Sequence, residues 1–121
     1  IIYEKWDSEK EIDQIKSFDI GLMPLIDDEY TQGKCGFKIL QYMSCGVVPI
    51  ASNIGFNKEI ISHGYDGFLV DTDKDWGKYI NTLKNNPELR YKMAQRARKK
   101  MIDNFDISIS SRKLLNKLEN L

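Results

Sequence analysis

Short apolar runs that read as β-strands alternate with segments of helical periodicity, and this alternation constrains the fold more than any other feature. The run at residues 19–25 is apolar almost throughout, as a strand covered by helices on both faces would be. The alternation predicts right-handed βαβ units, and hence an α/β fold with a Rossmann-like parallel sheet flanked by helices. The predicted strands are residues 1–3, 19–25, 47–51 and 68–70.

Helix signals fill the intervals between these runs. Ser8 and Glu11 match a capping box, in which two side chains satisfy backbone amides at the start of a helix. Gly46 follows a largely buried helical pattern over residues 36–45 and would end that helix. A short helical turn is expected from Lys58, a helix capped by Asp73, and a helix with Pro87 in its first turn. A last helix is expected after Asp106, with the apolar residues Leu114, Leu115 and Leu118.

Size and composition fit an ordinary globular protein. The 121 residues suit one domain, and a content of 41% hydrophobic and 30% charged residues excludes a disordered or fibrous chain. Cys35 and Cys45 are too few for a disulfide scaffold, and no apolar stretch is long enough for a membrane span or a leader. We therefore expect a cytoplasmic protein. Because the chain begins at Ile1 rather than Met, we expect residues 1–121 to be one truncated domain of a longer protein.

The loop and helix start at residues 33–38 are the strongest candidate for chemistry. They follow a predicted strand, and ligands of open parallel sheets collect beyond the carboxyl ends of the strands. The first turn of a helix has amides without partners and about half a positive charge, so it attracts anions. Gly33 and Gly36 would let a phosphate approach the backbone, while Lys34 and Lys38 add positive charge. The alternative is a helix cap with two solvated lysines.

Other polar residues allow both a functional and a structural interpretation. Gln41 shares a helix face with Lys38 and could pair with sugar hydroxyls, or it is an ordinary surface glutamine. The glycine loop at residues 52–57 would face the same ligand or simply connect a strand to a helix. The acidic residues 27–29 could bind a divalent cation, although a solvated loop is the commoner outcome. His63 has no second histidine or cysteine pair nearby, so no metal or cofactor is predicted, and no catalytic residue can be assigned.

Basic residues gather late in the sequence. Over the whole chain, 18 basic and 18 acidic residues cancel, which argues against nucleic-acid binding. The cations between residues 90 and 100 have no acid among them and could contact the inner face of an anionic membrane, where each adds about 1 kcal/mol. A solvated helix face is the alternative. These cations are Arg90, Lys92, Arg96, Arg98, Lys99 and Lys100.

A family resemblance is carried by residues 18–25, 33–46, 47–55, 59–61 and 64–69, in that order. Together they resemble the C-terminal, nucleotide-sugar-binding domain of the group 1 (family 4) retaining glycosyltransferases. Enzymes of this family have the GT-B architecture, in which two Rossmann-like domains enclose a cleft. The resemblance implies transfer of a sugar from a nucleoside diphosphate sugar to a hydroxyl acceptor, without a metal, and a place in polysaccharide biosynthesis.

The resemblance also assigns roles to individual positions. The backbone around Gly36, Phe37 and Lys38 matches the amides that meet the donor diphosphate, with Gly33 and Lys34 beside them. The family has a pair of glutamates where this sequence has Gly33 and Gln41. The amide of Gln41 can still bind the ribose, whereas the sugar contact at Gly33 is lost or moves to Lys34.

Some parts of the family's site are missing from this sequence. The resemblance places an arginine–lysine pair that neutralises the leaving diphosphate, and the N-terminal acceptor domain, upstream of Ile1. This chain alone should therefore be inactive or nearly so. The absent strands would also leave an exposed sheet edge, which predicts self-association. A non-catalytic Rossmann-like binding module and a GT-B sugar-nucleotide epimerase are the alternative functions.

Overall fold

A three-stranded parallel sheet forms the centre of the computed structural model, which describes residues 2–29, 36–105, 116 and 118–119. The described strands are β1 (Ile20–Met23), β2 (Val48–Ser52) and β3 (Phe68–Val70), in the spatial order β1-β2-β3. The register places Leu22 opposite Ile50. The parallel sheet expected from the sequence is confirmed, and the carboxyl ends of its strands lie at one edge.

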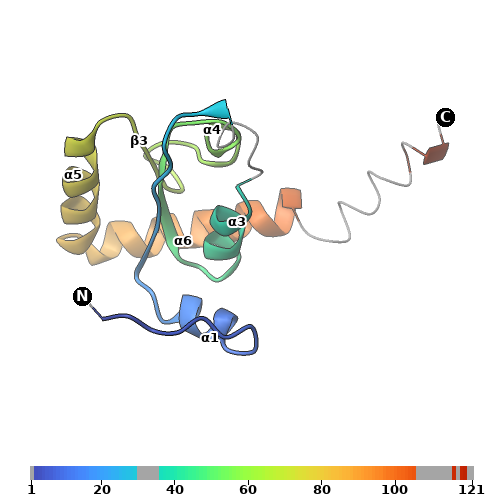
Figure 1. Cartoon of the computed structure of the whole chain (residues 1–121), viewed down its shortest axis with the longest axis horizontal. Helices are drawn as coiled ribbons and strands as arrows, with labels where there is room; N and C mark the ends of the chain where they lie inside the picture. The colour runs from blue at the N-terminus through green and yellow to red at the C-terminus, as the bar shows by residue number, and fades with distance from the viewer. Residues whose placement is uncertain (1, 30–35, 106–115, 117, 120–121) are drawn as a thin grey trace.

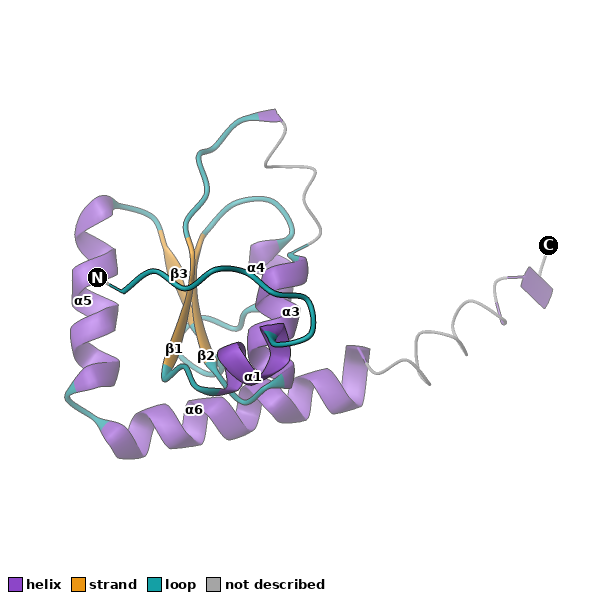
Figure 2. Cartoon of the chain, turned by 60° about the horizontal axis from the view of Figure 1, so that its bottom comes forward, coloured by secondary structure: helices purple, strands orange, loops and turns teal. Residues whose placement is uncertain are grey.

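Helices cover both faces of this sheet. They are α1 (Glu11–Lys16), α3 (Phe37–Ser44), α4 (Asn57–Ile60), α5 (Asp73–Lys84), α6 (Pro87–Lys100) and the π-helical turn η1 (Met101–Phe105). Figures 1 and 2 show α5 on one side of the strands, α3 and α4 on the other, and α6 running beneath both. This arrangement is the helix-flanked sheet that the alternation of patterns predicts.

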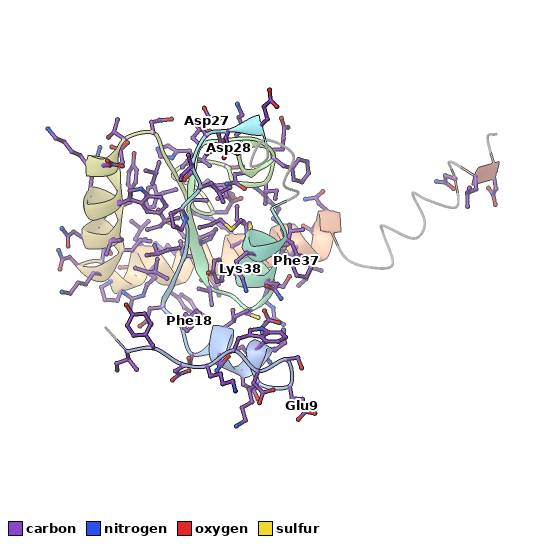
Figure 3. The ribbon with its side chains drawn as sticks, viewed as in Figure 1. Glu9, Phe18, Asp27, Asp28, Phe37 and Lys38 are labelled. Atoms are coloured by element: carbon purple, nitrogen blue, oxygen red, sulfur yellow. The ribbon has the colours of Figure 1, made fainter. Side chains whose placement is uncertain are left out.

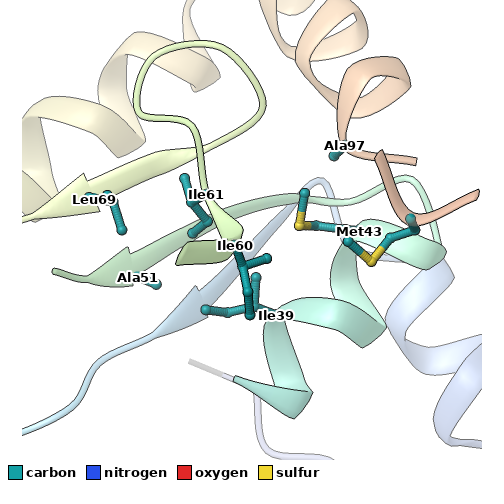
Figure 4. Packing of buried hydrophobic residues seen from close by; sticks show 8 residues of the cluster. Ile39, Met43, Ala51, Ile60, Ile61, Leu69 and Ala97 are labelled. Atoms are coloured by element: carbon teal, nitrogen blue, oxygen red, sulfur yellow. The ribbon is translucent and has the colours of Figure 1, made fainter. Parts of the chain in front are cut away.

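Strand β2 contributes to two hydrophobic cores, because successive side chains of a strand point to opposite faces. All five of its residues are buried. Ala51 points into the core beside α3 and α4 (Figure 4), whereas Ile50 points into the core beside α5. The first core comprises Ile39, Met43, Ala51, Ile60, Ile61, Leu69, Ala97 and Met101, and the second comprises Val48, Ile50, Phe68, Val70, Leu83 and Met93.

The predicted strand at residues 1–3 is wrong where the structure describes it. Ile2 and Tyr3 belong to no strand and are 91% and 89% exposed, while Ile1 lies outside the described residues. A strand needs a neighbour for its backbone groups, and β1 pairs only with β2 among the described residues. Strand β1 is thus an edge, and its Leu22 is 44% exposed rather than covered as the apolar run predicts.

The capping box predicted at α1 does not form. Instead of Ser8 and Glu11, the Asp7 carboxylate accepts a hydrogen bond from the backbone N–H of Glu9 at 2.9 Å. Lys10 then occupies the N-cap position without a side-chain hydrogen bond. Asp7 and Ser8 both favour helix starts, and the structure uses the first of them for the turn before the helix.

The cap of α5 is also one residue away from its predicted position. Thr72, not Asp73, is the N-cap. The carboxylate of Asp75 accepts hydrogen bonds from the backbone N–H groups of Thr72 at 3.0 Å and Asp71 at 3.2 Å. These bonds lower the pKa of Asp75, and the bond from Thr72 contributes most. The start of α6 is as predicted, with Pro87 in its first turn.

Two further expectations concern helix ends and the C-terminal residues. Gly46 follows α3 with a φ of 71°, a left-handed value that favours glycine, so it ends this helix as predicted. The helix predicted after Asp106, with Leu114 and Leu115, lies almost entirely outside the described residues. No helix within the described ranges is long and apolar enough to cross a membrane.

Candidate functional site

The loops after β1, β2 and β3 meet around a cavity of about 310 Å³ at the carboxyl ends of the strands. Ser52 joins two of these loops, because its Oγ accepts from the Leu25 backbone N–H at 2.8 Å and donates to the Leu25 carbonyl at 3.2 Å. Asn53 joins the third, donating from Nδ2 to Asp71 Oδ1 at 2.9 Å. The loop cluster expected from a parallel sheet is therefore present.

This cavity is acidic. Asp27, Asp71 and Asp73 line it, together with Asn53 and Trp76, and its described lining includes no lysine or arginine. Carboxylates at close range repel phosphate oxygens. The lining of this cavity therefore does not favour an anion.

The start of α3 is built around Gly36. Its φ of 69° is left-handed, and a Cβ at this position would lie 2.5 Å from Ile60 Cδ1 of α4. Both the conformation and the available space thus require glycine. Asn57 connects the same region to β2, because its buried side chain donates to the Ser52 carbonyl at 2.9 Å. The first turn of α3 is consequently fixed against α4 and the end of β2.

The first turn of α3 combines a helix start with an exposed surface. A helix start leaves backbone N–H groups without intrahelical acceptors, and no acidic side chain stands in this turn to neutralise them. Phe37 is 64% exposed, and Figure 3 shows it with Lys38 on α3. These are the features on which the predicted anion site depends, and that site stays a prediction.

Lys38 does not point freely into solvent. Its Nζ donates to Glu11 Oε1 at 3.2 Å, and the two side chains are 40% and 23% exposed. The hydrogen bond from Lys38 lowers the pKa of Glu11, and side-chain hydrogen bonds from Gln41 and Trp6 add to this effect. The structure thus brings a carboxylate of α1 to Lys38 of the predicted site.

Gln41 lies beside this ion pair, half-buried on α3. Its Oε1 is buried and has no hydrogen-bond partner among the described residues. No local sequence pattern connects Glu11 with Lys38 or Gln41. The packing of Ile15 in α1 against Tyr42 in α3 brings the two helices together.

Two of the predicted site residues, Gly33 and Lys34, lie outside the described residues, as does Cys35. Of the predicted anion site the structure describes Gly36, Phe37 and Lys38. Cys45 is a half-buried free thiol.

The remaining candidates have structural partners. His63 Nδ1 accepts from the Leu69 backbone N–H at 2.9 Å, and its ring packs edge-on against Phe68 and Tyr79. Within the described ranges, no group of three or more side chains could hold a metal ion.

Most of the basic residues on α6 are paired within the molecule. Arg96 donates to the Tyr65 carbonyl at 3.3 Å and lies over the Tyr65 ring. Lys100 Nζ is bound to the Ile60 carbonyl at 2.8 Å, to Ser62 Oγ at 2.9 Å and to the buried carboxylate of Asp66. The other contacts are Arg90 to the Leu83 carbonyl, Lys92 to Glu88 and Lys99 to Asp103.

Comparison with known sequences places most of the chain in one group. A model described as glycosyl transferases group 1 matches residues 6–100. The chain is 32% identical over 89 residues to N-acetyl-alpha-D-glucosaminyl L-malate synthase of Bacillus anthracis, covering 71% of this chain and 22% of that protein. It is 30% identical over 87 residues to GDP-Man:Man(3)GlcNAc(2)-PP-Dol alpha-1,2-mannosyltransferase of Dictyostelium discoideum, covering 71% and 17%. The chain thus spans about a fifth of the length of these relatives.

Solved structures agree at the level of the fold. The C-terminal domain of a group 1 glycosyl transferase family protein (LpcC) from Francisella tularensis superposes with a TM-score of 0.75 and 23% identity, covering 88% of this chain and 53% of that one. Anabaena HepE in complex with UDP-glucose gives a TM-score of 0.75 and 21% identity, covering 89% and 29%. The three parallel strands and their helices therefore have the fold of such a C-terminal domain.

Proposed function

This chain belongs to the group 1 glycosyl transferase family, and from that premise we propose that it is the donor-binding part of a retaining glycosyltransferase. The full-length protein would move a sugar from a nucleoside diphosphate sugar to a hydroxyl acceptor. HepE, which shares the fold, is bound to UDP-glucose in one structure and to UDP and glucose in another. The Dictyostelium relative is named for a GDP-mannose donor. Both names support a nucleoside diphosphate sugar as the co-substrate.

The observation that carries this proposal is the start of α3. Gly36 fixes the first turn against α4, and the turn offers amides and the Lys38 ammonium to an anion. When a diphosphate leaves, negative charge develops on its oxygens, and preorganised donors at that point lower the barrier electrostatically. Gly33 and Lys34 would extend the same site, and Gln41 would lie beside the ribose.

This chain alone would bind the donor without turning it over at a useful rate. Each preorganised donor contributes a few kcal/mol at most. The family resemblance places the remaining cations and the acceptor domain elsewhere in the full-length protein. Because amides and lysines neutralise the diphosphate in this proposal, binding should persist in the presence of EDTA.

The proposal also includes a biological process and a location in the cell. A place in polysaccharide biosynthesis, in the cytoplasm at the inner face of the membrane, suits a transferase that uses nucleotide sugars. Membrane contact through α6 would involve Lys92 and Lys99, which already form ion pairs with Glu88 and Asp103. Binding to anionic lipid vesicles, compared with neutral ones, tests this contact.

Replacing Lys38 tests the proposed donor site. We expect Lys38→Met to weaken binding of UDP or GDP by about tenfold, because one hydrogen bond to a charged group is lost. Titration calorimetry measures the affinity, and Lys84→Met at the end of α5 is the matched control. Equal affinities for the unmutated chain and Lys38→Met would remove Lys38 from the site.

A further inference from the structure

The Glu11 carboxylate of α1 lies close to the expected position of the ribose, the part of the proposed nucleotide next to the phosphates. Glu11 Oε1 accepts a hydrogen bond from Lys38 Nζ on α3, one turn before Gln41 on the same helix. We propose that Glu11 binds the vicinal diol of the donor's ribose. This inference rests on the proposed function, since it assumes that the diphosphate occupies the first turn of α3.

The position of Glu11 is fixed by packing. Ile15, one turn further along α1, is buried against Tyr42 and Val47. Glu11 Oε1 then accepts from Lys38 Nζ at 3.2 Å, a contact between residues 27 positions apart in the sequence. The carboxylate is therefore held against α3 by both a hydrophobic contact and an ion pair.

A carboxylate is the natural acceptor for a diol. The two ribose hydroxyls donate hydrogen bonds, and an ionised carboxylate has two oxygens with lone pairs to accept both. The Glu11 side chain is 23% exposed, so it is not sealed off from solvent. In contrast, Oε1 of Gln41 is buried. Glu11 therefore supplies the acceptor that the amide carbonyl of Gln41 does not present.

The spacing along α3 agrees with the order of groups in a nucleotide. A helix rises about 1.5 Å per residue, so Gln41 lies about 4.5 Å further along the axis than Lys38. The ribose is joined directly to the diphosphate, and a diphosphate at Gly36–Lys38 would place it near Gln41 and Glu11. Lys38 also neutralises Glu11, so this carboxylate does not present an uncompensated negative charge to the phosphates.

Two simpler roles for Glu11 make different predictions. The ion pair with Lys38 could serve only to hold α1 on α3, in which case the diol would not matter. Alternatively, Glu11 could act as an internal anion that competes with the diphosphate for Lys38. Removing the carboxylate would then strengthen binding of every nucleotide that carries a diphosphate.

The experiment compares nucleotides with and without the diol. Affinities of UDP and GDP and of their 2′,3′-dideoxy analogues are measured by calorimetry for the unmutated chain and for Glu11→Gln. For the unmutated chain we expect the ribonucleotide to bind roughly tenfold more tightly, as one or two hydrogen bonds to an ionised group would give. In Glu11→Gln this preference should fall several-fold, while affinity for the dideoxy analogue changes little.

Two control variants separate the roles. Glu9→Gln removes a carboxylate that points away from Lys38 (Figure 3) and should keep the full preference. Lys38→Met breaks the same ion pair but retains the Glu11 carboxylate, so it should bind both nucleotides more weakly and still prefer the diol. Circular dichroism confirms that each variant is folded.

Each other outcome overturns the inference. Equal weakening of both nucleotides by Glu11→Gln assigns Glu11 a purely structural role, and tighter binding of both makes it an internal competitor. If the unmutated chain binds both nucleotides equally well, the diol is not recognised, although the proposed function stands. If it binds neither UDP nor GDP, the proposed function fails and the inference fails with it.

Discussion

Gly36 connects the chemistry of the candidate site to the packing beneath it. The sequence predicts a glycine that lets a phosphate approach the backbone. The structure adds that a Cβ would meet Ile60 Cδ1 at 2.5 Å and that φ is 69°. That contact partner could not be predicted, because nothing local in the sequence places α4 against the start of α3. Glu11 was missed for the same reason.

Replacing Gly36 should separate strain from steric overlap. Gly36→Ala should destabilise the chain by about 2–3 kcal/mol, because a left-handed alanine costs about 1–2 kcal/mol and the Ile60 side chain must also move. The matched control is Gly46→Ala, at a φ of 71° with no atom within 4 Å of the added Cβ. Urea unfolding measures both free energies, and equal losses would show that Ile60 yields without cost.

The elements themselves follow the sequence closely where the pattern is long. The 12 residues of α5 and the 14 of α6 have continuous periodicity, and β2 and β3 are bounded by glycines and polar turns. Helix starts were less predictable. Asp71, Thr72 and Asp73 are all good cap residues, so the sequence alone cannot choose among them. The hydrogen bonds to Asp75 show which of them the fold uses.

The cap at α5 should make stability depend on pH. The pKa of Asp75 is lowered by folding, so its contribution is present above the unfolded value of about 3.9 and is lost as pH falls through the folded pKa. We expect Asp75→Ala to be less stable than the unmutated chain at pH 7, with the difference shrinking in acid. Thermal unfolding at several pH values measures it. Asp73→Ala is the matched control, and a difference that stays constant with pH would contradict this linkage.

At the scale of the whole molecule, the sequence predicted the parallel sheet and the family but also a strand that does not form. Ile2 and Tyr3 are apolar enough for a strand, yet pairing depends on a neighbouring strand that local sequence does not reveal. The same absence makes β1 an edge of the described sheet. This chain covers 53% of the Francisella domain, so nearly half of that domain has no counterpart here.

The β1 edge should drive self-association. Among the described residues no strand pairs with the outer side of β1, and this edge and the half-exposed Leu22 offer a surface to a second copy. Sedimentation velocity should show a dimer or larger species that grows with concentration. Leu22→Lys should suppress it, while Tyr91→Lys on the exposed side of α6 should not. A chain that sediments as a monomer at every concentration would refute the prediction.

Strand β2 separates the two cores but belongs to both of them, and this limits how the protein can open. Neither helical layer can leave without exposing a strand on which the other layer depends, so local unfolding on one side is penalised on both. A nucleotide that steadies α3 should therefore slow amide hydrogen exchange in α5 and α6 as well. Binding at the donor site would thus stabilise both helical layers of the domain, because both pack on the same strand.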